Sequence, residues 1–224
     1  MILVSLSVSC DKPGVDRKKR PRRGTPIETR ARLVAAAAEV FNRVGYQGTD
    51  SNRLAQAAGY APATFYKHFP DKRAIFLAAY EAWVTSEWAE VDRLVREAPD
   101  AGTRARRIVE MTVAHHRKWR GLRASLRALV AVDPEARTFY RAQRRRQLHL
   151  VAAMRGGGSP STHQAERDAI LLFTLERVCD AVAEGEVRDL GLGVAPTVQE
   201  LRRLVARALG VRRAGGPDRR GSTP

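Results

Sequence analysis

The residues that could carry chemistry fall in two places, and neither forms a recognisable catalytic set. His115 and His116 are adjacent, with Trp119 close behind. Neighbouring residues on a helix diverge by about 100°, so the two imidazoles cannot share a metal as histidines four residues apart do. Glu176 and Asp180 share a helix face, but neither a nucleophile nor a glycine-rich phosphate loop accompanies them. The sequence therefore predicts no enzyme, no metal site and no cofactor.

A second set of polar residues has the pattern of a helix that binds nucleic acid. Residues 51–58 and 62–68 are expected to be short helices joined by a tight turn at Gly59, which readily adopts positive φ. Phe65 and Phe69 lie four residues apart and form the buried stripe of the second helix. Its other faces carry hydrogen-bonding and cationic side chains: Thr64, Tyr66, Lys67 and His68. Such a helix, apolar inside and polar outside, suits entry into a DNA groove.

Composition agrees with a helical protein that binds a polyanion. Of the 224 residues 44% are hydrophobic and 6% aromatic, and 40 Lys and Arg against 24 Asp and Glu give a net charge of +16. This charge favours nucleic acid as a partner, the alternative being a solvated arginine-rich surface. The two cysteines lack metal-ligand spacing, which is typical of a reducing cytosol. Residues 1–10 are too short and lack the basic start of a signal sequence, so we expect a cytoplasmic protein without a membrane span.

Proline, glycine and apolar periodicity divide the chain into helices. The expected helices are, in order, about 26–44, 51–58, 62–68, 72–97, 103–119, 122–132, 134–154, 162–184 and 196–209. Thr49 or Asp50 can cap the second helix and Asp71 the fourth. Gly121 marks a joint between the fifth and sixth helices, and a glycine-rich turn is expected around 185–195. No strand is expected, and the fold class is therefore all-α with about nine helices. Residues 17–23 place six cations in seven positions and cannot bury a core, so a disordered basic arm is expected at the N-terminus.

Several short motifs stand in a fixed order around the helix pair. They are Ala37 with Phe41, Gly45-Tyr46, Thr49, Leu54-Ala55, Ala58-Gly59, Ala63-Thr64-Phe65-Tyr66-Lys67-His68-Phe69 and Lys72. In this order and spacing the stretch resembles the DNA-binding domain of the TetR family of transcriptional regulators. Two positions depart from that pattern. Ser51 stands where the family has an apolar residue, and Ala61 replaces a Ser or Thr cap, whose absence costs about 1 kcal/mol.

The resemblance implies a domain plan. Residues 1–26 would be the disordered basic arm, 27–80 the helix-turn-helix DNA-binding domain, 81–210 a helical bundle for effector binding and dimerisation, and 211–224 a disordered tail. The arm would add electrostatic affinity for the DNA backbone, the alternatives being insertion into the minor groove or no contact at all.

The resemblance also implies roles for single residues. Pro62, Ala63 and Thr64 would approach bases, Tyr66 and His68 phosphates, and Thr49 the DNA backbone. Lys72 would contact a phosphate and cap a helix, and Lys67 is the candidate for sequence specificity. The alternatives left open are packing of Tyr66 on the fourth helix, a structural His68 and a solvated Lys72.

An effector pocket is implied inside the bundle. Its candidate lining residues are Trp83, Met111, His115, Trp119, Phe139, Tyr140, Phe173 and Cys179, each with an ordinary core role as the alternative. The last two long helices would form the dimer interface through Leu171, Leu172, Leu175 and Val178 and through Leu201, Leu204, Val205 and Leu209.

The function implied is a ligand-responsive regulator, in the first place a repressor. It would bind a palindromic operator in double-stranded DNA as a homodimer and be released by a small-molecule effector of unknown identity. Two other classes compete with it: a basic architectural DNA-binding protein without an effector, and a helical enzyme that carries a DNA-binding domain.

Overall fold

The computed structural model describes residues 24–154 and 163–210. The predictions for the basic arm over 1–23, for the glycine-rich segment 155–162 and for the tail 211–224 fall outside these residues. The ten helices of the described part are α1 (Pro26–Val44), α2 (Ser51–Ala57), α3 (Pro62–Tyr66), α4 (Lys72–Glu97), α5 (Ala101–Lys118), α6 (Arg120–Val132), α7 (Pro134–Met154), α8 (Gln164–Glu184), α9 (Glu186–Asp189) and α10 (Val194–Gly210). The described residues contain no strand, so the all-α prediction is confirmed.

Helix starts follow the local sequence closely. Thr25 opens α1 with a capping box, in which its hydroxyl and the carboxylate of Glu28 exchange hydrogen bonds with each other's backbone N–H. Asp50, Asp71 and Asp133 each accept a hydrogen bond from the backbone N–H three residues later, at 2.7–2.9 Å. The expected capping role of Asp71 is therefore confirmed, and Asp50 rather than Thr49 caps α2.

Three helix boundaries differ from expectation. α9 is a tenth, one-turn helix within the glycine-rich stretch expected to be a turn. The expected helix 62–68 ends at Tyr66. Gly121, expected as a joint, lies inside α6, and the break falls at Trp119. Glycine is required at position 121 by packing, because a Cβ there would lie 1.9 Å from the carbonyl oxygen of Asn42 in α1.

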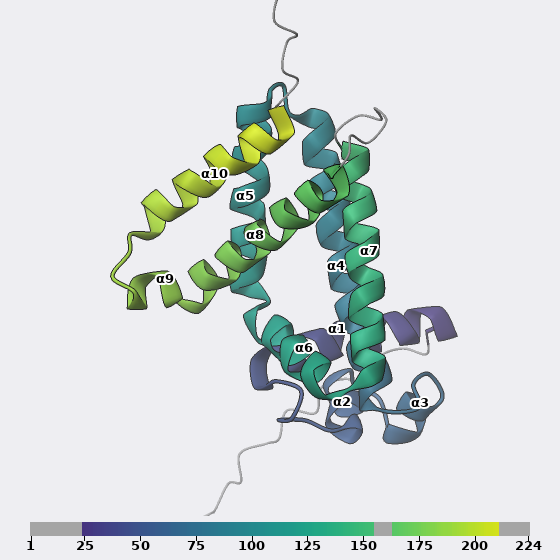
Figure 1. The fold of residues 1–224 in the computed structure, drawn as a ribbon. Helices are drawn as coiled ribbons and strands as arrows, with labels where there is room; N and C mark the ends of the chain where they lie inside the picture. Colours follow the sequence, from purple (N-terminus) through teal and green to yellow (C-terminus); the bar gives the residue numbers. More distant parts are fainter. Residues whose placement is uncertain (1–23, 155–162, 211–224) are drawn as a thin grey trace, which may run out of the picture.

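The first three helices share one core with the bundle above them. Figure 1 shows α1, α2, α3 and α6 together at one end of the molecule, with α4, α5 and α7 rising from it. Phe41, Phe65 and Phe76 are fully buried in this core, and so is Leu122 of α6. The expected boundary near residue 80 is therefore crossed by continuous packing, which ties the first three helices to α6.

A second core joins α5, α8 and α10. It contains the residues on which a dimer interface was expected: Leu172, Leu201 and Val205 are buried, and Leu171, Leu175, Val178 and Leu209 pack against buried residues. Leu172, Leu201 and Val205 are covered within the chain itself, because helical periodicity reveals an apolar face but not the partner that covers it. A dimer contact by the four partly buried residues stays a prediction. Leu204 is 37% exposed.

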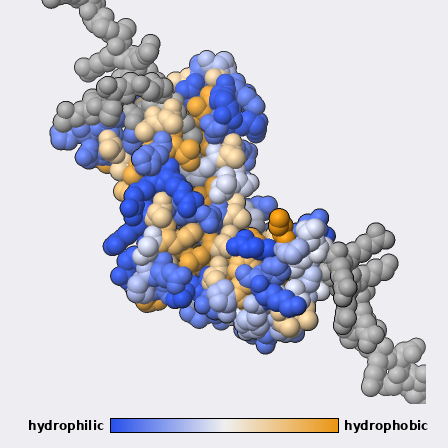
Figure 2. Space-filling model, turned by 90° about the vertical axis from the view of Figure 1, so that its right-hand side faces the viewer, coloured by the Kyte–Doolittle hydropathy of each residue, from blue (hydrophilic) through white to orange (hydrophobic). Residues whose placement is uncertain are grey.

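The surface is mostly hydrophilic. The face drawn in Figure 2 shows charged and polar residues around a band of hydrophobic ones. Apolar side chains on the surface include Ile170 and Phe173 of α8, which are 65% and 50% exposed. Within the part of the chain that the structure describes, none of the helices has the length and apolar character needed to cross a membrane.

Candidate DNA-binding surface and effector cavity

The α2–α3 pair forms a helix-turn-helix. Leu54 and Ala55 of α2 are fully buried, and Gly59 turns the chain at φ +80°, a conformation that suits glycine. Phe65 is fully buried and Phe69 is 3% exposed, which confirms their predicted core role. With the apolar side fixed inward, the opposite side of α3 faces solvent.

Most of the predicted DNA-contacting residues lie on or near this exposed side. Ala63, Tyr66 and Lys67 are exposed, while Pro62, Thr64 and His68 are half-buried. Tyr66 is 56% exposed and makes an edge contact with the Phe65 ring rather than packing under α4. Ala61 makes no side-chain cap hydrogen bond, as its sequence departure indicated. Their contacts with DNA stay predictions.

Thr49 and Lys72 occupy a different environment. The Lys72 ammonium points inward, donates hydrogen bonds of 3.0 Å to the carbonyls of Tyr46 and Thr49, and lies 4.3 Å from the centre of the Tyr46 ring. Thr49 is 6% exposed, and its hydroxyl finds no hydrogen-bond partner in the described part of the chain. Lys72 therefore clamps the α1–α2 connection, and a phosphate contact by either residue stays a prediction.

We expect Lys72→Ala to lower the free energy of unfolding by about 1–3 kcal/mol, because two carbonyls lose a charged donor. DNA affinity should fall on all sequences alike, since the whole helix-turn-helix loosens. Urea unfolding and titrations on operator and scrambled DNA measure both effects. Lys67→Ala is the matched control and should change stability by less than about 0.5 kcal/mol.

A salt dependence of binding that becomes shallower by about 1 in Lys72→Ala would show that Lys72 also neutralises a phosphate. Unchanged stability would contradict the clamp.

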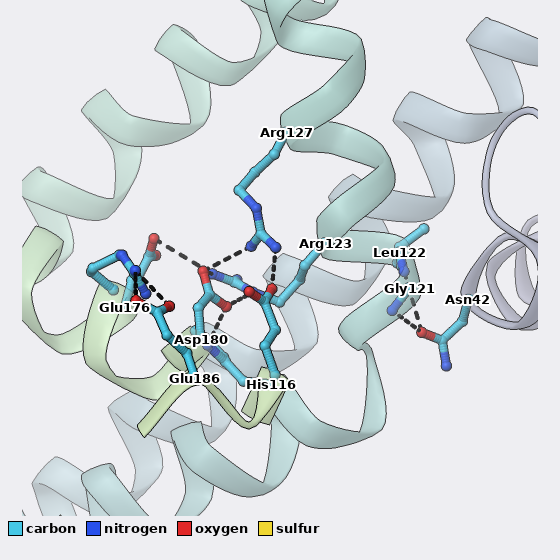
Figure 3. Close-up of polar contacts among 11 residues, drawn as sticks. Asn42, His116, Gly121, Leu122, Arg123, Arg127, Glu176, Asp180 and Glu186 are labelled. Atoms are coloured by element: carbon cyan, nitrogen blue, oxygen red, sulfur yellow. Dashed lines mark hydrogen bonds and ion pairs between the residues drawn. The ribbon is translucent and has the colours of Figure 1, made fainter. Parts of the chain in front are cut away.

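The C-terminal bundle contains a buried cluster of charged residues (Figure 3), to which α5, α6 and α8 contribute. Arg123 of α6 is 6% exposed and donates hydrogen bonds of 2.8 and 3.1 Å to the two carboxylate oxygens of Asp180. His116 of α5 is 1% exposed, with Nδ1 2.9 Å from Asp180 Oδ1. Arg127 binds Asp180 at 2.9 Å and also binds Glu184. The cluster therefore fastens α6 to α8.

Burial shifts the pKa values of Glu87 on α4 and of His116 in the cluster in opposite directions. It raises the pKa of Glu87 to about 8 and lowers the pKa of His116. Burial would also raise the pKa of Asp180, but hydrogen bonds from His116 and Arg123 outweigh it and hold that pKa well below its usual range. Near neutral pH, Glu87 is therefore protonated and Asp180 ionised.

An apolar cavity of about 60 Å³ lies beside the cluster, enclosed by α4, α5, α7, α8 and α10. Its polar lining consists of Glu87, Thr112, His116 and Glu176. The remaining lining residues are Trp88, Val91, Ile108, Val151, Leu171, Leu172, Leu175, Val205 and Leu209.

None of the eight predicted effector residues lines this cavity. Trp83, His115 and Trp119 line a groove of about 670 Å³ formed by α1, α4 and α5. Tyr140 and Phe173 line a recess of about 270 Å³ beside the charged cluster. The remaining three, Met111, Phe139 and Cys179, pack in or against hydrophobic cores.

The sequence contains a signal for this cavity in the position of one acidic residue. Glu87 is a carboxylate on the apolar face of α4, in line with Val84 and Val91. A charged residue on a buried helix face requires a partner or a function.

Asn42 connects the DNA-binding helices to α6. Its amide nitrogen donates a 2.7 Å hydrogen bond to the carbonyl of Lys118, and its oxygen accepts from the N–H groups of Gly121 and Leu122 at 3.0 and 3.2 Å (Figure 3). One turn further along α6, Ser125 accepts a 3.0 Å hydrogen bond from the Tyr46 N–H. The end of α1 is therefore fixed to α6, which in turn is fixed to α8.

The described part of the chain is therefore a helix-turn-helix joined by a shared core to a helical bundle that contains a cavity. The sequence profile of bacterial regulatory proteins of the tetR family matches residues 33–79. This match assigns residues 33–79 to a DNA-binding domain of the tetR type.

Relatives support that assignment and differ in their ligands. The HTH-type transcriptional activator FasR of Mycolicibacterium smegmatis is 33% identical over 100 residues, 42% of this chain and 46% of FasR, so the match spans less than half of that relative. Thermus thermophilus FadR, a TetR-family repressor solved with lauroyl-CoA, superposes with a TM-score of 0.57 at 21% identity, over 84% of this chain and 98% of its own. A Saccharomonospora viridis regulator solved with choline gives 0.61 at 21% identity, over 80% and 96%.

Proposed function

We propose that this protein is a ligand-responsive regulator, in the first place a repressor, that binds a palindromic operator as a homodimer in the cytoplasm. The observation that carries the proposal is the linkage of an exposed recognition helix to a ligand-sized cavity through hydrogen-bonded helices. The proposed domains are 27–80 for DNA binding and 81–210 for effector binding and dimerisation, and the basic residues of segment 1–26 would add electrostatic affinity.

In this proposal α3 enters the major groove. Lys67 is exposed and Thr64 lies near the start of the helix, so these two side chains read bases. Tyr66 and His68 flank them and contact phosphates. Contacts to phosphate position the protein, whereas contacts to base edges specify the sequence.

Ligand control runs through α6. A molecule in the cavity contacts α5 and α8, both of which hold the charged cluster through His116 and Asp180. Movement of Asp180 displaces Arg123 and hence α6, and Asn42 transmits this to α1. Since α1 and α3 share a core, the spacing of the two recognition helices in a dimer changes and operator affinity falls.

The dimer surface combines the exposed apolar residues of α8 and α10 with the turn between them. These residues are Ile170, Phe173, Leu190, Leu192 and Leu204. Covering these side chains with a second copy of the chain would remove apolar area from water, which favours association.

Selection of bound sequences from a random DNA library tests the function. Wild type should enrich one palindrome, and Lys67→Ala or Thr64→Ala should relax one position in each half-site, with a loss of about 1–3 kcal/mol of discrimination there. Lys118→Ala is the control, because this exposed lysine lies on α5 and should leave the preference unchanged.

Equal enrichment of all sequences would instead support the architectural alternative. If both α3 variants select the same motif as wild type, α3 does not contact the bases that determine the sequence.

A further inference from the structure

We propose that the cavity binds a compact apolar molecule that carries a protonated amine, with Glu87 as the counter-ion. This inference rests on the proposed effector role of the C-terminal bundle and assigns the chemical class of its ligand. Relatives with the same fold were solved with ligands as different as lauroyl-CoA and choline, so the class must come from this chain's own residues.

Of the two glutamates that line the cavity, Glu87 is the one with a buried oxygen that lacks a hydrogen-bond partner among the described residues. Its side chain is 7% exposed, and its Oε1 atom accepts no hydrogen bond from the described residues. The nitrogen atom recorded near Oε1 is His115 Nδ1, at 3.6 Å, beyond hydrogen-bond distance. A buried carboxyl oxygen without a partner costs free energy that a donor on a ligand would recover.

The charges around the cavity favour a cation over an anion. In the part of the chain that the structure describes, no lysine or arginine lines the cavity, whereas two glutamates do. The arginines nearest to it are already neutralised, since Arg123 binds Asp180 and Arg144 binds Glu176. An anionic head group would therefore find no unpaired lysine or arginine in the described lining to balance its charge.

The size of the cavity limits the ligand. About 60 Å³ holds roughly four to six water molecules, which is the scale of a short alkyl chain or a single ring. The apolar walls from α4, α5, α8 and α10 would cover that chain. An acyl chain of lauroyl length would require the helices to move apart.

Binding of an amine should release a proton. The carboxyl group of Glu87 is protonated at pH 7, its pKa being about 8, and a cation at hydrogen-bond distance favours the carboxylate. The ammonium stays charged, Glu87 gives its proton to the buffer, and an ion pair forms in the cavity. The other charged or titratable groups that face Glu87 are His115 and His116 of α5, Arg123 of α6, Arg144 of α7, and Glu176 and Asp180 of α8.

Three probes of equal chain length test the head group: n-hexylamine, n-hexanol and hexanoate. Isothermal titration calorimetry at pH 7, in buffers of different ionisation enthalpy, gives both affinity and protons released. We expect hexylamine to bind at least about tenfold more tightly than hexanoate and to release about one proton. Glu87→Gln should weaken hexylamine binding at least about tenfold, abolish proton release and leave hexanol binding within about threefold.

Glu90→Gln is the matched control. Glu90 lies on the same helix as Glu87, but its carboxylate lines the groove beside α1 and not the cavity. Its removal should leave all three titrations unchanged. Tighter binding of hexanoate, or release of the same proton by Glu87→Gln, would overturn the inference, as would failure of every probe to bind.

The same protein preparations are titrated with the selected operator. If they bind it specifically and hexylamine does not bind, the amine inference fails while the proposed regulator stands; if no specific operator binding occurs, the proposed function itself fails.

Discussion

Asp180→Ala is expected to lower the free energy of unfolding by about 3–5 kcal/mol. The substitution leaves the buried Arg123 guanidinium without its bidentate partner, and the next carboxylate, Glu176, is 3.8 Å away. Removing one member of a buried ion pair costs this much because an uncompensated charge remains in a low dielectric. Urea unfolding monitored by circular dichroism measures the difference.

Two further variants test whether the loss of stability comes from the unpaired buried charge. Asp180→Leu combined with Arg123→Met replaces the pair with apolar side chains and should recover most of the lost stability. Asp92→Ala removes an exposed carboxylate that pairs with Arg96 on the surface of α4, and it should cost less than about 1 kcal/mol. A loss in Asp180→Ala no larger than in Asp92→Ala would contradict a structural role for the cluster.

The pH dependence of this difference has a definite sign. The folded pKa of Asp180 lies below its unfolded value of about 3.9, so its contribution is fully present above that value and is lost as the pH falls further. The contribution of Asp180 to the difference in free energy of unfolding between wild type and Asp180→Ala should therefore be constant above about pH 5. In more acidic solution this difference should become smaller.

Gly121→Ala should separate the DNA-binding helices from α6. The new Cβ would lie 1.9 Å from the carbonyl oxygen and 2.8 Å from the carbonyl carbon of Asn42, and neither backbone atom can yield without moving α1. Overpacking of this kind costs about 1–3 kcal/mol, and loss of the Asn42 hydrogen bonds adds to it. We expect stability to fall by at least about 2 kcal/mol and operator affinity to lose its response to the effector.

Gly102→Ala is the control for a glycine-to-alanine change in a helix. Its Cβ would meet the side-chain Oδ1 of Asp100 at 3.1 Å, where that oxygen caps α5 by accepting from the Thr103 N–H, so stability should change by at most about 1 kcal/mol in either direction. Unfolding curves and operator titrations with and without hexylamine compare the two variants. If Gly121→Ala behaves like Gly102→Ala, the contact between α1 and α6 does not carry the coupling.

Local signals predicted the DNA-binding part well. The spacing of Phe65 and Phe69, the glycine at 59 and the cap at Asp71 are each set by residues near in sequence, and the structure confirms all three. Local chemistry suffices there because the helices are short and their turns need particular residues.

Packing in the C-terminal bundle could not be predicted from helical periodicity, because periodicity does not show which helices cover one another. Leu172 and Leu201 were expected at a dimer interface because they form apolar faces, but α5, α8 and α10 cover one another. Gly121 was expected to break a helix, whereas it permits close approach of α1. The inward clamp of Lys72 joins residues more than 20 positions apart, and no local pattern encodes it.

Hydroxyl-radical footprinting of wild type on its selected operator tests the central claim, that two recognition helices related by a two-fold axis read DNA. We expect two protected patches with dyad symmetry, about 34–36 Å or a multiple of one helical turn apart, and no pattern on scrambled DNA. Even protection along both DNAs, without a dyad, would contradict the account.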